Sequence, residues 1–238
     1  FSLNRKELRS IKSGVLPIFL VCLFIFGLIM LQPDFGTGVI IVMTIVGMLF
    51  VGGVNFNFFI RLGILGLCGI SGLIIAAPYR LKRILSFLNP WSDPLGSGFQ
   101  IIQSLYAIGS GGMFGLGLGN SKQKYLYIPE PHNDFIFSIL AEELGFVGCI
   151  VVIALFMIFI WRGILIAMRT TDMFGSLIAV GITTLIAFQA IINISVVTAT
   201  VPTTGMSLPF FSYGGTALLL LLANVGILLN ISRSNSKV

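Results

Sequence analysis

The sequence predicts an all-α integral membrane protein: a bundle of six spanning helices with one long extracytoplasmic loop that contains an amphipathic helix. Hydrophobic residues make up 56% of the 238 residues and charged residues only 9%, and the mean hydropathy is +1.05. Such a chain has too few polar side chains to cover the surface of a soluble globule. Its apolar runs are continuous rather than alternating, which favours helices over a β-barrel.

Runs without any Asp, Glu, Lys or Arg locate the spans. Three runs carry no charge, and Asp34 alone interrupts a fourth; the four are 62–79, 144–161, 174–232 and 13–60. One crossing needs about 20 residues, so the run 174–232 must hold two helices. The six predicted spans form a single membrane domain, 1–238, with residues 80–134 as its long loop. They cover residues 13–31, 36–54, 60–79, 135–160, 174–199 and 214–231.

Lys and Arg residues predict the orientation, because cytoplasmic loops carry an excess of both. Nine of the fourteen flank the same ends of the spans: Arg5, Lys6, Arg9, Lys12, Arg61, Arg162, Arg169, Arg233 and Lys237. We therefore expect both termini of the chain in the cytoplasm. The other five lie in the long loop and need another explanation: Arg80, Lys82, Arg83, Lys122 and Lys124.

Several function classes are excluded by the same composition. The net charge of +6 does not indicate nucleic-acid binding, because the basic residues are scattered over loops on two membrane faces. Cys22, Cys68 and Cys149 sit in apolar runs without metal-ligand spacing, and we interpret them as small hydrophobic residues. His132 is the only histidine, so no site that needs two imidazoles can form within this chain.

Two segments of the long loop indicate order. In residues 98–109, apolar side chains including Ile102 and Tyr106 gather largely on one side and Ser104 lies elsewhere, which predicts a helix at the membrane interface. Residues 109–119 are rich in glycine, but their spacing fits neither phosphate-binding pattern. We predict close backbone packing or a re-entrant turn for this glycine segment.

Asp134 is the main functional candidate, because it stands at the mouth of a very apolar helix. A carboxylate at membrane depth is costly unless it is paired or faces a water-filled cavity, so such residues usually mark reaction sites or ion paths. The alternative is that Asp134 only caps the helix by accepting hydrogen bonds from its first free N–H groups.

Six ordered motifs across the chain resemble the SEDS (shape, elongation, division and sporulation) family of bacterial cell-wall proteins, which includes FtsW, RodA and SpoVE. They are QPDFGT at 32–37, NPWSDP at 89–94, QSLYAIG at 103–109, PEPHNDFIF at 129–137, AEELG at 141–145 and PFFSYGG at 209–215. Residues 115–124 resemble the FtsW and SpoVE branch, which implies a role at a division or sporulation septum. Family members have ten transmembrane helices, so the chain resembles helices five to ten.

The resemblance implies a peptidoglycan glycosyltransferase that polymerises lipid II into glycan strands, with a class B penicillin-binding protein as partner. Asp134 matches the essential aspartate of the family and would be the general base; Glu130 is the second choice, and His132 a polar neighbour. The loop cations Arg80, Lys82, Arg83, Lys122 and Lys124 would bind the lipid diphosphate, directly or beside a divalent cation, Mg²⁺ or Mn²⁺. Attraction to anionic headgroups is an equal alternative for them.

Other assignments stay open at this stage. Asp34 lies on the same predicted face as Asp134, where it would line the same cavity, cap the second span or pair with a cation. For Glu142 and Glu143 we predict a structural pairing inside the bundle. A lipid II flippase is the alternative function, although the later spans offer little beyond Gln189 and Asn193 for a polar path. A scaffold that recruits a transpeptidase is the third, and it would leave the 129–134 cluster unexplained.

The predicted orientation can be tested with single cysteines at Ser97, Ser207 and Ser234. The first two should react with an impermeant thiol reagent added to intact protoplasts, and the third should not, because the nine flanking Lys and Arg residues place position 234 in the cytoplasm. Labelling is measured by mass shift on a gel. The reverse pattern would invert the topology and remove Asp134 from the outer face.

Overall fold

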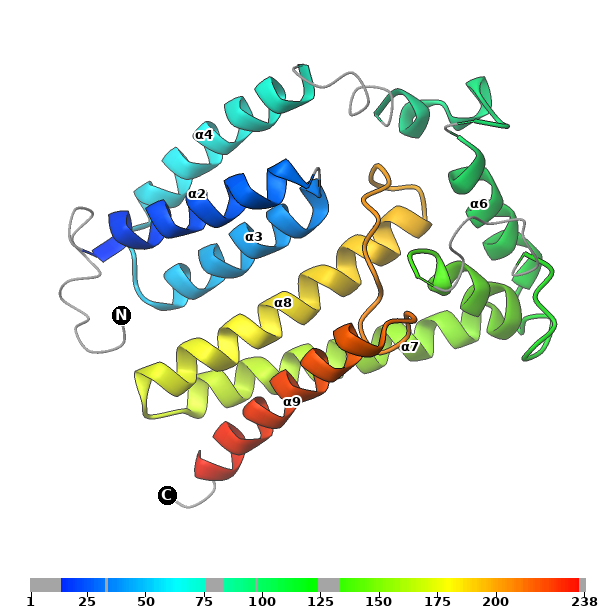
Figure 1. The fold of residues 1–238 in the computed structure, drawn as a ribbon. Helices are drawn as coiled ribbons and strands as arrows, with labels where there is room; N and C mark the ends of the chain where they lie inside the picture. Colours follow the sequence, from blue (N-terminus) through cyan, green and yellow to red (C-terminus); the bar gives the residue numbers. More distant parts are fainter. Residues whose placement is uncertain (1–13, 33, 76–83, 97, 124–132, 236–238) are drawn as a thin grey trace. The chain divides into compact units, whose positions relative to one another are not determined.

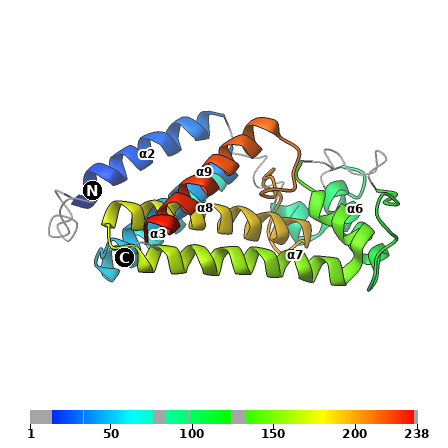
Figure 2. The same cartoon turned by 90° about the horizontal axis from the view of Figure 1, so that it is seen from below.

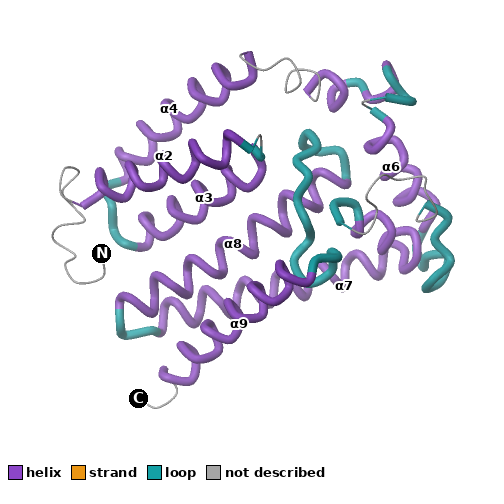
Figure 3. Tube along the Cα trace, in the orientation of Figure 1, coloured by secondary structure: helices purple, strands orange, loops and turns teal. Residues whose placement is uncertain are grey.

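The computed structural model describes residues 14–32, 34–75, 84–96, 98–123 and 133–235, and the regular structure of this part of the chain is helical throughout (Figures 1 and 3). The all-α prediction is therefore confirmed. The helices, with the 3₁₀ turn η2, are α2 (Leu16–Leu31), α3 (Phe35–Val51), α4 (Phe56–Ile75), η2 (Pro90–Ser92), α6 (Phe99–Gly111), α7 (Ile136–Arg169), α8 (Met173–Val197) and α9 (Gly215–Asn235).

Three of the described helices are long and apolar enough to cross a membrane: α7, α8 and residues Gly215–Arg233 of α9. Three further apolar stretches are shorter: Leu16–Leu31, Phe35–Val51 and Phe56–Gly69. A helix of 16 or 17 residues reaches about 24–26 Å at 1.5 Å per residue, less than the hydrocarbon thickness of about 30 Å. Helices thus lie over all six predicted spans, and the number of crossings stays a prediction.

The chain divides into two compact units. The first unit comprises Phe1–Leu67, Met157–Phe188 and Thr216–Val238, and the second comprises Cys68–Phe156 and Gln189–Gly215. Because α7 and α8 each run through both units, one part of each helix belongs to the first unit and the other part to the second. Asp34 lies in the first unit and Asp134 in the second.

Small residues allow close helix packing in the first unit. A Cβ atom added at Gly163 of α7 would lie 2.2 Å from Oγ1 of Thr183 in α8, and one at Gly47 of α3 would lie 3.1 Å from Cγ2 of Thr184. Helix α8 is therefore in tight contact with α7 through Thr183 and with α3 through Thr184, as is common where membrane helices approach through glycine. Figures 1 and 2 show these parts of α7 and α8 running side by side.

Asp34 caps a helix in the first unit. It is the N-cap residue of α3, and its Oδ1 atom accepts a hydrogen bond from the backbone N–H of Thr37 at 3.0 Å. This bond satisfies one of the free N–H groups at the start of the helix. Of the three roles considered for Asp34, the structure shows the capping role.

In the second unit, α6 lies over the segment for which we predicted a helix, but its buried face differs from the predicted one. Ser104, which we placed away from the apolar side, is completely buried, and Tyr106 is 52% exposed. The hydroxyl of Ser104 donates to the carbonyl oxygen of Val197 at 2.7 Å, so a hydrogen bond to the end of α8 holds this face inside the unit. The helical periodicity of the apolar residues could not reveal that bond.

Candidate active site

The turn that carries Asp134 is anchored by the buried start of α7. Phe135 and Phe137 are each 3% exposed, and Ser138 is completely buried and donates its hydroxyl proton to the carbonyl oxygen of Phe135 at 2.7 Å. Asp134 itself is half-buried, so its carboxylate stands at the border between this apolar anchor and the surroundings. The described part of this motif, NDFIF at 133–137, folds in this way because its two phenylalanines enter the core while Asp134 precedes them.

The connection between α8 and α9, residues 198–214, is tied to this turn by two side chains. The Nδ2 atom of Asn193, near the end of α8, donates to the carbonyl oxygen of Asp134 at 2.8 Å and to that of Met206 at 2.6 Å. The hydroxyl of Ser212 donates to the carbonyl oxygen of Asn133 at 2.5 Å and accepts from the N–H of Leu208 at 2.7 Å. The turn and the 198–214 connection are thus joined through hydrogen bonds that are buried or partly buried.

Gly205 of this connection lies beside the carboxylate of Asp134. A Cβ atom added at Gly205 would be 3.5 Å from Oδ2 of Asp134, and Gly205 has a φ of +73°, which L side chains rarely adopt. The connection also packs on α7, where the ring of Phe156 lies 6.5 Å and 6.2 Å from the rings of Phe210 and Phe211. A side chain at position 205 would therefore be in van der Waals contact with the carboxylate.

Helix α7 is broken at Gly145, which has φ 68° and ψ −167°. The break releases backbone groups from the helical hydrogen-bond pattern, and the glycine segment that follows α6 pairs with them. We call this arrangement, formed by residues 112–117 and 142–147, the interlock. Four hydrogen bonds cross it: Leu116 N to Glu142 O (2.9 Å), Gly117 N to Glu143 O (3.0 Å), Phe146 N to Gly112 O (2.9 Å) and Val147 N to Met113 O (3.2 Å).

Only glycine fits at the centre of the interlock. A Cβ atom at Gly145 would lie 2.3 Å from the backbone nitrogen of Gly115, and one at Gly115 would lie 2.1 Å from the carbonyl oxygen of Glu143. Both residues also have positive φ values, 68° and 77°. The predicted close backbone packing of the glycine segment is thereby confirmed, with α7 as the backbone that it contacts.

The side chain of Glu142, a residue of the interlock, binds the loop residues 121–123. It is 1% exposed, and its carboxylate accepts hydrogen bonds from Ser121 Oγ (2.5 Å), Lys122 N (3.0 Å) and Gln123 N (3.4 Å). Glu143 Oε1 accepts from the backbone N–H of Ser121 at 3.3 Å. These hydrogen bonds of the two side chains thus run to the loop: Glu142 holds residues 121–123, and Glu143 holds Ser121.

The predicted site residues fall into two groups. Asp34, Lys122 and Asp134 are described: Asp34 caps α3, and the side chain of Lys122 is exposed while its N–H donates to Glu142. The remaining candidates lie outside the described residues: Arg80, Lys82, Arg83, Lys124, Glu130 and His132. Within the described ranges, no group of three or more His, Cys, Asp and Glu side chains could hold a metal ion.

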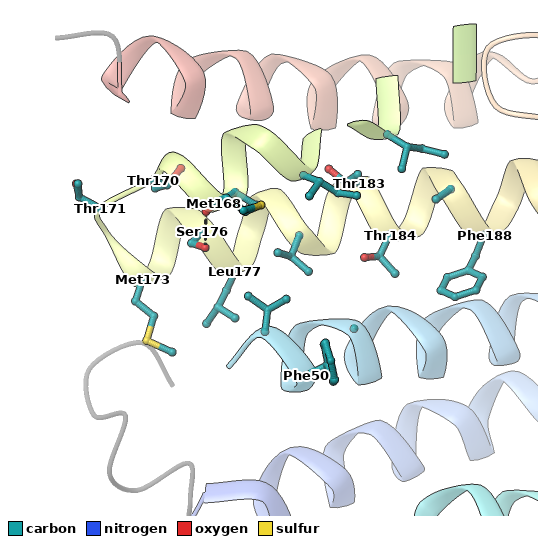
Figure 4. Close-up of a pocket in the computed structure, with 17 residues that line it drawn as sticks. Phe50, Met168, Thr170, Thr171, Met173, Ser176, Leu177, Thr183, Thr184 and Phe188 are labelled. Carbon is teal, nitrogen blue, oxygen red and sulfur yellow. Dashed lines mark hydrogen bonds between the residues drawn. The ribbon is translucent and has the colours of Figure 1, made fainter. Parts of the chain in front are cut away.

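A cavity in the first unit holds none of these residues. It has a volume of about 950 Å³ and is lined by residues of α3, α7 and α8 together with Thr170 and Thr171 (Figure 4). The hydroxyls of Thr170, Ser176 and Thr183 donate to carbonyl oxygens of α7 and α8, so they are engaged in the helices that line it. Its lining contains no charged side chain, and it is not a candidate reaction site.

Sequence comparison connects the chain with known proteins. The family model for FtsW, RodA and SpoVE, described as "Cell cycle protein", matches residues 1–237. Stage V sporulation protein E of Bacillus subtilis is 54% identical over 230 residues, which cover 97% of this chain and 63% of that protein. The probable peptidoglycan glycosyltransferase FtsW of Trichlorobacter lovleyi is 47% identical over 234 residues, 98% of this chain and 61% of that protein. The chain thus spans less than two thirds of the length of these relatives.

Solved structures share the fold. A structure titled "Structural coordination of polymerization and crosslinking by a peptidoglycan synthase complex" matches with a TM-score of 0.73 and 31% identity, over 97% of this chain and 64% of the other. The rod shape determining protein RodA of Thermus thermophilus matches with a TM-score of 0.63 and 27% identity, over 97% of this chain and 61% of the other.

The role of Glu142 can be tested by Glu142→Leu, which keeps a similar volume and removes both acceptor oxygens. Unpaired buried donors cost about 1–3 kcal/mol, so amides of Lys122 and Gln123 should exchange hydrogen about 10- to 100-fold faster. Hydrogen–deuterium exchange on the full-length protein measures this. Glu142→Gln, which keeps one acceptor oxygen, should show a smaller effect, and the amide of Gly175 in the first unit should not change. Unchanged protection of residues 122 and 123 in Glu142→Leu would contradict the assignment.

Proposed function

The chain belongs to the family of cell cycle proteins that includes FtsW, RodA and SpoVE, and we propose that it is a peptidoglycan glycosyltransferase that polymerises lipid II into glycan strands. The relatives that bear the name FtsW are called probable peptidoglycan glycosyltransferases. Because the chain spans less than two thirds of those relatives, the proposal concerns the full-length protein.

The placement of Asp134 is the observation that carries the proposal. Its carboxylate is half-buried, stands beside Gly205 and belongs to a turn held by α7, α8 and the 198–214 connection. A general base must be held in a defined position relative to the hydroxyl that it deprotonates. Glu142, whose side chain is 1% exposed, has its oxygens occupied by three donors and is not accessible for that role.

In the proposed reaction, the 4-hydroxyl oxygen of one sugar attacks the anomeric carbon of another. A bond forms between these two atoms, the bond from the anomeric carbon to the diphosphate oxygen breaks, and the lipid diphosphate leaves. Asp134 accepts the proton of the attacking hydroxyl, which makes that oxygen more nucleophilic as the new bond forms. The leaving diphosphate needs cationic groups to stabilise its developing charge.

Lys122 is the described candidate for that second task. Its backbone N–H donates to Glu142, which holds this part of the loop in place. Its side chain is exposed, so the ammonium group can contact an anionic ligand. We propose the same role for Arg80, Lys82, Arg83 and Lys124, and a neighbouring one for Glu130 and His132. A requirement for Mg²⁺ or Mn²⁺ stays a prediction, and no reaction step is assigned to such an ion.

The proposed function also implies a membrane orientation and a partner. We propose that Asp134 and the 80–134 loop lie on the outer face of the bacterial plasma membrane, at the septum, with both termini of the chain in the cytoplasm. The likeness to a peptidoglycan synthase complex supports a class B penicillin-binding protein as partner. A flippase path is less well supported, since the Nδ2 atom of Asn193 is committed to two carbonyl oxygens and its Oδ1 atom is buried.

Asp134→Asn should abolish polymerisation while membrane insertion and lipid binding remain. Loss of a general base typically lowers turnover about 10²- to 10⁴-fold, and the amide keeps nearly the same shape. A gel-based lipid II polymerisation assay on the full-length protein with its partner measures this. Asp172→Asn is the matched control, because Asp172 caps α8 in the first unit and should be dispensable for turnover. Near-normal glycan product from purified Asp134→Asn would refute the assignment of the base.

Substitution of the loop cations separates diphosphate binding from headgroup attraction. A charge-assisted bond to the leaving group strengthens in the transition state, so at least one of Lys122→Gln, Lys124→Gln, Arg80→Gln and Arg83→Gln should lower turnover more than it raises the apparent KM. Diffuse attraction to headgroups would instead weaken with added salt. Arg169→Gln, at the predicted cytoplasmic end of α7, is the control. Turnover within about twofold in all four variants, under 0.5 kcal/mol, would remove these residues from the leaving-group site.

A further inference from the structure

Asn193 is an unusual residue for its place in α8. It is 1% exposed, and its immediate neighbours in the helix are apolar isoleucines at 191, 192 and 194. Both hydrogen bonds of its side chain use Nδ2, which donates to the carbonyl oxygens of Asp134 and Met206. The Oδ1 atom is buried and has no hydrogen-bond partner.

This hydrogen-bond pattern fixes the orientation of the amide. If the amide were turned over, Oδ1 would face two carbonyl oxygens, and all three atoms are acceptors. Only the NH₂ group of the amide can satisfy both carbonyls. Leaving Oδ1 buried without a donor is unfavourable, and a leucine would fill the same place in α8 without that penalty. Packing of α8 alone therefore does not account for an asparagine at this position.

The two carbonyls held by Asn193 and Ser212 lie on either side of the Cα atom of Asp134. Ser212 binds the carbonyl of Asn133, which belongs to the peptide group before Asp134. Asn193 binds the carbonyl of Asp134, which belongs to the peptide group after it. Because both flanking peptide planes are fixed, the direction of the Cα–Cβ bond of Asp134 is fixed as well.

The second hydrogen bond of Asn193 holds the backbone of the 198–214 connection that lies beside the carboxylate of Asp134. Met206 follows Gly205, whose missing side chain leaves backbone next to Oδ2 of Asp134. One amide group therefore holds both the residue that carries the carboxylate and the backbone that faces it. We propose that Asn193 is a positioning residue for Asp134, with Ser212 as the second hydrogen bond of the same device. This inference rests on the proposed role of Asp134 as the base.

The test compares Asn193→Leu with Ser104→Ala in the full-length protein with its partner. Asn193→Leu removes both donated hydrogen bonds and adds no buried charge, whereas Ser104→Ala removes another buried hydrogen bond to backbone in the same unit, one that Val197 and not the Asp134 turn accepts. A small displacement of a catalytic group can cost about 10²-fold in rate. We expect Asn193→Leu to lower kcat about 10- to 100-fold with the apparent KM within about threefold, and Ser104→Ala to keep kcat within about twofold.

A double variant separates positioning from general stability. If Asn193 acts through Asp134, the residual turnover of Asp134→Asn, about 10²- to 10⁴-fold below that of the unsubstituted protein, should not fall further when Asn193→Leu is added, because the group that Asn193 positions is already lost. Independent effects would multiply. Thermal unfolding of each variant, measured in the same detergent, gives the folded fraction by which kcat is corrected.

Ser212→Ala provides a second route to the same answer, should Asn193→Leu not fold. It frees the carbonyl of Asn133 and should lower kcat about tenfold with little change in the apparent KM. If the folded variants at positions 193 and 212 keep kcat within about twofold while Asp134→Asn is inactive, the positioning role is overturned and the base assignment stands. If Asp134→Asn itself turns over normally, the proposed function of Asp134 fails instead.

Discussion

The second unit depends on one constraint, which is that backbone groups released by the break in α7 must be paired again. At Gly145 the chain leaves the helical path inside an apolar segment, where an unpaired N–H or carbonyl group would cost several kcal/mol. The glycine segment after α6 supplies the missing donors and acceptors through the four bonds of the interlock. This joins α6 to α7 and brings residues 121–123 within reach of Glu142, so the placement of residues 112–123 follows from the break.

The fold was predictable where it rests on composition and periodicity. Charge-free runs located six apolar segments, and a helix lies over each of them. The break at Gly145 was not predictable in this way, because a glycine inside an apolar run is common in membrane helices. Neither was the buried face of α6, because Ser104 faces inward for a single hydrogen bond to Val197. Long-range backbone contacts leave no periodic signal in the sequence.

The proposed site starts from an acidic residue that the sequence alone singles out, and the role of that residue stays a prediction. Asp134 stood out because a carboxylate at the mouth of an apolar helix is energetically costly unless it is paired or faces a water-filled cavity. The hydrogen bonds that hold its turn, from Asn193 and Ser212, were not predicted, since these residues lie 59 and 79 positions from their acceptors at 134 and 133. The available signal was a lone asparagine among isoleucines in α8, and from the sequence we considered it only as one of the few polar residues that a flippase could use.

Asp134 and Glu142 are two carboxylates of the second unit that have different surroundings. Glu142 is 1% exposed and accepts from three donors of residues 121–123, so a substrate hydroxyl could reach it only if those bonds broke. At Asp134 the backbone receives the hydrogen bonds from Asn193 and Ser212, while the half-buried carboxylate faces the bare backbone of Gly205. For the base that we propose, the hydrogen bonds from Asn193 and Ser212 hold the turn through backbone carbonyl oxygens and use neither oxygen of the carboxylate.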